Sequence, residues 1–434
     1  QASPSPTDPP ETPRPFPYFG VSMRRVTKEF GLIEAQEVGV GAVRQAAVRW
    51  RDVEPTRTNP PTYRWRALAD LDLQLINAAE AGLEVELLVM NTPEWAQQVP
   101  GSSCGPIKED RLDAFAQFLE AAVERYSRPP YNIQHWELYN EPDVDPSLVP
   151  PDSGFGCWGD QDDEYYGGRY YATMLKHAYP AIKQADPHAK VILGGLLLDD
   201  PELPPITFLN GVFEGGGGDY FDILAFHAYT LFSPEYYNWG TLPGTHWIDR
   251  GGVIIGKTAF LRQTLEHYGY DKPIFLNEVG LAWTLPGDPT DEYRQGQADY
   301  VVKVHTRGLA LDLANVTWFG WRGPGWRHMA LLHEDLSPTP AYHAYANVIK
   351  QLSDAEYVGP AGHDGLEGYL FQRDNNLLEV LWSADGKANE VTYPSGRFSG
   401  ATDLFGQSVA GQQSGGQVVL SVRRPTYVEI WPEN

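Results

Sequence analysis

The chain has 434 residues, with 33 basic and 57 acidic side chains, which gives a formal net charge of −24 at pH 7. A surface this acidic argues against binding to nucleic acid or anionic membranes. No apolar run is long enough to predict membrane insertion. The length is sufficient for a barrel domain of about 250 residues or more together with a small second domain.

Residues 1–17 are rich in proline, serine and threonine, and the chain begins with Gln1 rather than methionine. This composition predicts a disordered tether that remains after removal of a signal peptide. An extracellular or cell-surface location is the corresponding expectation. An engineered truncation is the alternative explanation for this N-terminus.

Eight apolar segments typical of buried strands are interspersed with helical patterns between residues 18 and 352. We expect strands at 19–23, 42–48, 85–90, 133–139, 191–198, 222–229, 274–278 and 314–321. We expect helices at 28–38, 63–81, 112–126, 166–185 and 251–267. Strands and helices in this order predict an α/β fold with a parallel sheet.

Two of the expected strands end in glutamate. The fourth runs into Asn140-Glu141-Pro142, and the seventh ends at Glu278. Proline has no N–H to donate, so a central strand stops there, and a carboxyl group at the end of a buried strand is partly desolvated. A single glutamate in such a place is more often a helix cap or a solvated charge. The pair is what cleavage of a glycosidic bond requires.

Asn-Glu-Pro after the fourth strand and a glutamate after the seventh make the sequence resemble the clan of retaining glycoside hydrolases built on a (β/α)8 TIM barrel. The segments 63–95 and 331–345 are also similar to clan patterns, and the resemblance covers residues 18–350. It implies that Glu141 is the acid/base and Glu278 the nucleophile. Their carboxyl groups are expected about 5 to 5.5 Å apart. One departure is Asn277, where many relatives have threonine.

The resemblance also implies a set of residues that contact the sugar or the nucleophile. They are Arg44, Asn91, Trp95, Asn140, His227, Tyr229, Trp318 and Trp321. His227 and Tyr229 are two apart in a strand and face the same side, whereas strand geometry lets at most one of Trp318 and Trp321 reach the sugar. Structural roles remain open for several of them: an ordinary ion pair for the arginine, and core or rim packing for the aromatic residues.

Two long loops are expected over the active face, at 143–163 after the fourth strand and at 230–249 after the sixth. Long loops in compact folds are usually functional. Their aromatic residues, Trp158 and Trp239 among them, are candidates for sugar contacts and favour an open groove and internal cleavage. A pocket walled at one end by the same loops is the alternative. The only two cysteines, Cys104 and Cys157, lie in loops expected after neighbouring strands, and our hypothesis is that they form a disulfide.

After residue 352 the pattern changes to short alternating strands at 368–380, 391–393, 402–406 and 418–430. This predicts a β-sandwich domain over 353–434. Similar sandwiches follow the barrel in family 39 and related β-glycosidases. The sequence leaves open whether the first sandwich strand comes from before the barrel.

The expected function is that of a secreted retaining glycosidase that cleaves β-glycosidic bonds of an oligo- or polysaccharide. No cofactor motif such as a glycine-rich phosphate loop is present, and the mechanism needs no metal ion. Two alternatives stay open: a metal-dependent barrel hydrolase using His227, His246 and Glu278, and a non-catalytic carbohydrate-binding protein. Sensitivity to a chelator would favour the first, and glycan binding without turnover the second.

Overall fold

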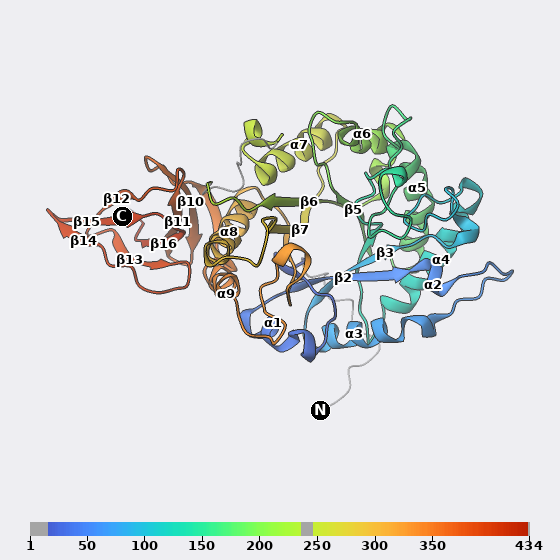
Figure 1. The fold of residues 1–434 in the computed structure, drawn as a ribbon, viewed down its shortest axis with the longest axis horizontal. Helices are drawn as coiled ribbons and strands as arrows, with labels where there is room; N and C mark the ends of the chain where they lie inside the picture. The colour runs from blue at the N-terminus through green and yellow to red at the C-terminus, as the bar shows by residue number, and fades with distance from the viewer. Residues whose placement is uncertain (1–15, 236–245, 433–434) are drawn as a thin grey trace.

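The computed structural model describes residues 16–235 and 246–432. Eight parallel strands form a closed barrel in which every strand pairs with its neighbours in chain order (Figure 1). The strands are β1 (Phe19–Ser22), β2 (Ala42–Arg49), β3 (Glu84–Met90), β4 (His135–Leu138), β5 (Lys190–Leu196), β6 (Ile223–Leu231), β7 (Ile274–Ala282) and β8 (Asn315–Phe319). The expected TIM barrel is confirmed.

Helices surround the barrel and connect its strands (Figure 1). They are α1 (Leu32–Val38), α2 (Trp50–Val53), α3 (Ala69–Glu80), α4 (Leu112–Tyr126), α5 (Gly168–Ala185), α6 (Thr207–Glu214), α7 (Val253–His267), α8 (Asp291–Ala310) and α9 (Pro340–Leu352). No helix in the described part of the chain is long and apolar enough to cross a membrane.

The helices follow from apolar spacing and from capping residues. In α4, Leu112, Phe115 and Leu119 are buried at helical spacing and turn one face toward the barrel. At the start of α9, the Thr339 side chain accepts a hydrogen bond from a backbone N–H, and Pro340 occupies the first turn. A capping threonine and an early proline are typical of a helix start.

Phe16 closes the end of the barrel at which the strands begin. Its ring lies 4.4 Å from that of His135 and 5.1 Å from that of Phe275, centroid to centroid. Asn315 donates a hydrogen bond of 2.8 Å to the carbonyl of Pro17. The tether expected over 1–17 therefore does not include Phe16 and Pro17, because the ring contacts of Phe16 and the hydrogen bond to Pro17 hold these partly buried residues against the barrel. Residues 1–15 lie outside the described residues.

A second domain follows the barrel and packs beside α8 and α9 (Figure 1). It has a five-stranded antiparallel sheet and a three-stranded one, as the predicted β-sandwich requires. Its strands are β9 (Glu356–Pro360), β10 (Leu366–Arg373), β11 (Asn376–Ser383), β12 (Asn389–Pro394), β13 (Phe398–Asp403), β14 (Gln412–Ser414), β15 (Gln417–Val422) and β16 (Thr426–Ile430). We propose the domain boundary between α9 and β9, at residues 352 and 353.

Two segments of the sandwich that were expected as single strands are pairs of strands. Residues 368–380 turn back between β10 and β11, where Asp374 has a φ of 51°. Asp and Asn tolerate this left-handed conformation, so Asp374-Asn375 is a hairpin turn signal. Residues 418–430 are divided at Pro425 between β15 and β16. The apolar pattern on both sides hid the two turns.

The two cysteines are joined. Cys104, in the loop after β3, and Cys157, in the loop after β4, form a buried disulfide with a Cα–Cα distance of 5.3 Å. The bond closes a loop across a sequence separation of 53 residues. It connects the segment that follows Glu141 to the neighbouring loop of the same barrel face.

Replacing both cysteines by serine is expected to lower the free energy of unfolding by about 4 kcal/mol, the chain-entropy value for a loop of this length. Urea denaturation of the variant and of the wild-type protein measures the difference. Reductant should destabilise only the wild-type protein. Two reactive thiols in unfolded, unreduced wild-type protein would contradict the disulfide.

Candidate active site

The two glutamates come from strands that are not adjacent in the barrel, with β5 and β6 between them. Glu141 follows the end of β4, and Glu278 lies within β7. The seventh strand was expected to end at Glu278, but β7 continues to Ala282. Its pairing with β6 shifts register between Phe226 and His227, and this irregularity places His227 beside Glu278. Bulges next to active sites commonly redirect a side chain in this way.

A tight corner of backbone holds Glu141. Its φ is 47°, a left-handed value that few non-glycine residues adopt, and its N–H donates to the carbonyl of Gly195 at 3.0 Å. A side chain at Gly194 would place its Cβ 2.0 Å from the carbonyl oxygen of Tyr139. The two glycines of β5 therefore let the Asn-Glu-Pro corner lie directly against that strand.

Burial keeps the carboxyl group of Glu141 protonated at pH 7. The residue is only 6% exposed, and burial raises the pKa of its carboxyl group to about 8. Its Oε1 lies 2.7 Å from Nδ1 of His227. Burial also lowers the pKa of His227 to about 4, so the ring is neutral at pH 7. It therefore carries no positive charge that would favour loss of the proton from Glu141.

Glu278 lies in a different environment, between two donors. Nη1 of Arg44 donates to its Oε1, and the hydroxyl of Tyr229 donates to its Oε2. These bonds fix the orientation of the carboxylate and leave it facing the cavity described below. One oxygen of Glu278, one of Glu141 and a ring nitrogen of His227 all lie within 4.8 Å of one another.

Beneath the two glutamates is a buried polar network that the sequence analysis missed. Arg44 holds Glu137 with two bonds of 2.8 Å, and Nδ2 of Asn277 donates to Glu86 at 2.8 Å and to Glu137 at 3.2 Å. The Arg44 charge helps to lower the pKa of Glu137, whereas burial raises that of Glu86 well above its usual value. The sequence did contain a signal for this network, because Glu86 and Glu137 are acidic residues inside the otherwise apolar strands β3 and β4.

A cavity of 760 Å³ opens beside Glu278 and is lined by the ends of β8, β1 and β2 and the loops that follow them. Asn91, Asn140 and Trp321, three of the residues predicted to contact a sugar, contribute to its lining. Trp321 is only 1% exposed and donates to the carbonyl of Gly31 at 2.8 Å, so like the buried tryptophans described below it holds a structural position. Asn140 accepts a bond of 2.7 Å from Arg44, which ties it to the polar network.

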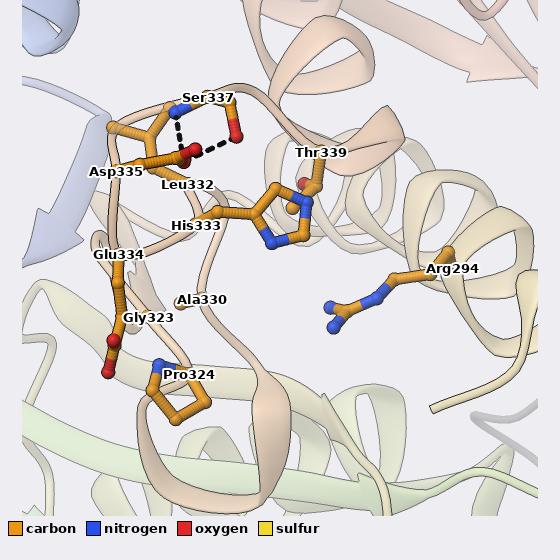
Figure 2. Close-up of a pocket in the computed structure, with 10 residues that line it drawn as sticks. All are labelled: Arg294, Gly323, Pro324, Ala330, Leu332, His333, Glu334, Asp335, Ser337 and Thr339. Atoms are coloured by element: carbon orange, nitrogen blue, oxygen red, sulfur yellow. Dashed lines mark hydrogen bonds between the residues drawn. The ribbon is translucent and has the colours of Figure 1, made fainter. Parts of the chain in front are cut away.

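A smaller cavity of 510 Å³ shares Gly323, Pro324 and Glu334 with this one. Figure 2 shows the Arg294 guanidinium directed into the smaller cavity from α8, opposite His333. The loop after β8 therefore separates two hollows on the same side of the barrel mouth.

Three more of the expected tryptophans take structural positions instead. Trp158 is 1% exposed and packs on Tyr139, and Trp318 is fully buried and donates to the carbonyl of Met329 at 2.9 Å. Neither can stack on a sugar, because no face of the ring is accessible. Trp95 packs on Trp50 and does not line the cavity. Trp239 lies outside the described residues.

Trp326 is an aromatic residue at the site that the sequence analysis did not identify. It lines the cavity with 48% of its surface exposed, and its ring lies 5.1 Å from that of Tyr229. It follows β8 in a short 3-10 helix, Trp326–His328, on a loop that the strand pattern does not cover. An exposed ring beside the residue that binds Glu278 is suited to stacking against a sugar.

The alternative metal site is not assembled as expected. His246 lies 2.9 Å from Asp200, and Glu141 rather than His246 joins His227 and Glu278 as the third potential ligand. The guanidinium of Arg44 already binds Glu278 and would repel a second cation there. The donor set therefore fits a proton-transfer site better than a metal centre.

The sequence matches no protein-family model and no curated protein. Solved structures do match it. A family 39 glycoside hydrolase from the gut symbiont Bacteroides cellulosilyticus WH2 superposes with a TM-score of 0.72 at 16% identity, covering 96% of this chain and 81% of that chain. The catalytic domain of the family 30 xylanase C from Talaromyces cellulolyticus has a TM-score of 0.63 at 13% identity, with 97% and 98% covered.

A third similar structure is a conserved exported protein from Bacteroides fragilis, with a TM-score of 0.68 at 11% identity and coverage of 96% and 98%. At these identities the comparisons establish the fold. This chain has the fold of glycoside hydrolases of families 39 and 30, a closed parallel barrel followed by antiparallel sheets.

Proposed function

We propose that this protein is a secreted glycoside hydrolase that cleaves an oligo- or polysaccharide by double displacement with retention of configuration. The observation that carries the proposal is the pairing of two carboxyl groups in opposite environments. Burial raises the pKa of Glu141 to about 8, while Glu278 is bound by Arg44 and Tyr229. Two carboxyl groups in such different environments are typical of an acid and a nucleophile that act together.

In the first step, the carboxylate of Glu278 attacks the anomeric carbon and the glycosidic C–O bond breaks. Glu141 transfers its proton to the leaving oxygen, so the leaving group departs as a neutral alcohol. In the second step, Glu141, now a carboxylate, takes a proton from water while the water oxygen attacks the anomeric carbon. Glu278 is released with its charge restored.

The spacing of the two groups supports retention over inversion. Oxygens of Glu141 and Glu278 lie within 4.8 Å of each other. Inverting enzymes keep their carboxyl groups about 6.5 to 9.5 Å apart to make room for water, and retaining enzymes about 5 to 5.5 Å. The closer spacing leaves room for one anomeric carbon between the two side chains.

Three observations support the remaining parts of the proposal. The disulfide fits an oxidising, extracellular setting, and one similar structure is an exported protein. The exposed ring of Trp326 beside Tyr229 fits a carbohydrate ligand. The barrel fold alone hosts many chemistries, so the site rather than the fold carries the assignment.

Incubation with a panel of aryl glycosides, followed by proton NMR of the first product formed, tests the proposal. The initial product is expected to have the same anomeric configuration as the substrate. An inverted product would contradict the double displacement. Glycan binding without turnover of any glycoside would instead favour a carbohydrate-binding protein.

A further inference from the structure

The cavity beside Glu278 differs in charge from the rest of the molecule. Five arginines and three acidic residues line it, in a chain that has 33 basic and 57 acidic residues. The arginines come from the ends of β1, β2 and β8 and the loops that follow them, and they are Arg24, Arg44, Arg49, Arg51 and Arg322. A cleft lined by one sign of charge concentrates ligands of the opposite sign.

Two of these arginines are already neutralised. Arg44 is bound by Glu137 and Glu278, and Arg51 lies 2.7 Å from Asp152. Each of these two arginines binds a carboxylate of the protein itself, so its charge is not available to a ligand. The remaining three arginines determine the charge that a ligand meets.

Arg322 is held in place without a carboxylate. Its Nε and Nη2 both donate to the backbone carbonyl of Glu334, and the guanidinium lies 4.8 Å from the centre of the Phe30 ring. A carbonyl and a ring orient the group but do not cancel its charge. Within the described residues, Arg322 forms no ion pair, and neither does the side chain of Glu334.

Arg24 and Arg49 complete the group. Arg49 is the last residue of β2, and Arg24 follows β1, which pairs with β2 along one side of the mouth. Both side chains are exposed, and in residues 16–235 and 246–432 neither has a hydrogen bond or ion pair. Among the described lining residues, three guanidinium groups therefore have no carboxylate partner, against one acidic residue, Glu334, that has no ion pair.

We propose that this cavity binds a sugar unit bearing an anionic group, either a uronosyl carboxylate or a sulfate ester. The planar fork of arginine matches both groups, with two parallel hydrogen bonds to a pair of oxygens. The proposal rests on the proposed function, because the cavity is a sugar subsite only if Glu278 is the nucleophile. The charged unit then belongs to the part of the substrate on the Glu278 side, away from the proton donor.

The first experiment measures binding and does not depend on turnover. Calorimetric titration of the Glu141→Gln protein uses oligogalacturonides, chondroitin sulfate oligosaccharides, and neutral xylo- and cello-oligosaccharides as probes. At least one acidic probe is expected to bind at least about tenfold more tightly than the neutral ones. Raising NaCl from 50 to about 500 mM should remove most of that preference. The probe that binds distinguishes carboxylate from sulfate.

The same titration with Arg322→Gln and with Arg49→Gln added should reduce the preference for the acidic probe about tenfold or more in each case. Arg322→Lys should retain part of it, since the charge remains but the fork is lost. Arg128→Gln is the matched control, because this exposed arginine follows α4 at the opposite end of the barrel and has no side-chain partner among the described residues. Far-UV circular dichroism checks that each variant is folded.

Neutral and acidic probes binding equally, or an acidic preference untouched by both glutamine variants, would overturn the proposal. The second experiment compares kcat/KM for aryl glycosides of one sugar with a hydroxymethyl, carboxylate or sulfated group at C6. Turnover of the neutral member without acidic binding would refute the anionic ligand and leave the glycosidase standing. Binding of an acidic probe without turnover of any of these aryl glycosides would support the anionic ligand and contradict the glycosidase.

Discussion

Replacing Glu278 by alanine is expected to lower kcat for aryl glycosides by at least about 10⁴-fold, because no other group can form the covalent intermediate. The remaining residues of the site stay close to their places, since Arg44 keeps its two bonds to Glu137 and Tyr229 stays packed against Trp326. The loss therefore reports the missing nucleophile rather than unfolding. Circular dichroism and the melting temperature verify this point.

Azide should restore turnover of the Glu278→Ala protein. The alanine leaves room for a small anion on the face from which Glu278 attacked, and a single displacement by azide gives a glycosyl azide of inverted configuration. Product NMR distinguishes this outcome from simple hydrolysis. Glu390→Ala, an exposed position in the sandwich, is the control and should keep full activity. An azide product of inverted configuration from the Glu141 variant would instead identify Glu141 as the nucleophile and Glu278 as the acid/base.

The proposed catalytic pair could be identified from the sequence because strands and their ends are local signals. The Asn140-Glu141-Pro142 corner predicts a strand end, and β4 ends just before it at Leu138, while the apolar run before Glu278 predicts a buried strand. Once the order of the eight strands is known, these two local patterns place both glutamates at the same end of the barrel. His227 followed from the same reasoning, since its position in β6 fixes the side it faces.

The roles of the loop aromatics could not be predicted, because a tryptophan in a loop has no period from which to infer its direction. Trp158 packs beneath the loop, against Tyr139, while Trp326 remains exposed at the cavity. Both occur in glycine- and proline-rich stretches, so composition does not separate them. Their burial is decided by contacts between segments far apart in the chain.

The charge of the cavity was equally hidden. The net charge of −24 describes the average surface and argues only against large polyanions. Arg24, Arg49 and Arg322 are far apart in the sequence, and only closure of the barrel between β8 and β1 brings them to one cavity. A small anionic group on a sugar meets this local field, not the average one.

The second large effect is expected at Glu141, and it should depend on the leaving group. A proton donor matters little when the departing oxygen is already a stable anion, as in a dinitrophenyl glycoside. It matters most when the leaving group is a sugar or an alkyl alcohol. For Glu141→Ala we therefore expect kcat/KM to be nearly unchanged for dinitrophenyl glycosides and to fall about 10² to 10⁴-fold for oligosaccharides.

The pH profile separates this role from a structural one. Burial sets the pKa of Glu141 to about 8, with Arg44 and Lys257 opposing the shift and Asp199 adding to it. Because the active form is protonated, kcat/KM of the wild-type protein for a poor leaving group should decline as the pH rises through about 8. Glu141→Ala should lose that decline, since the group that titrates is gone. A variant that is equally slow on both substrates and keeps the alkaline limb would assign the proton donor to another residue.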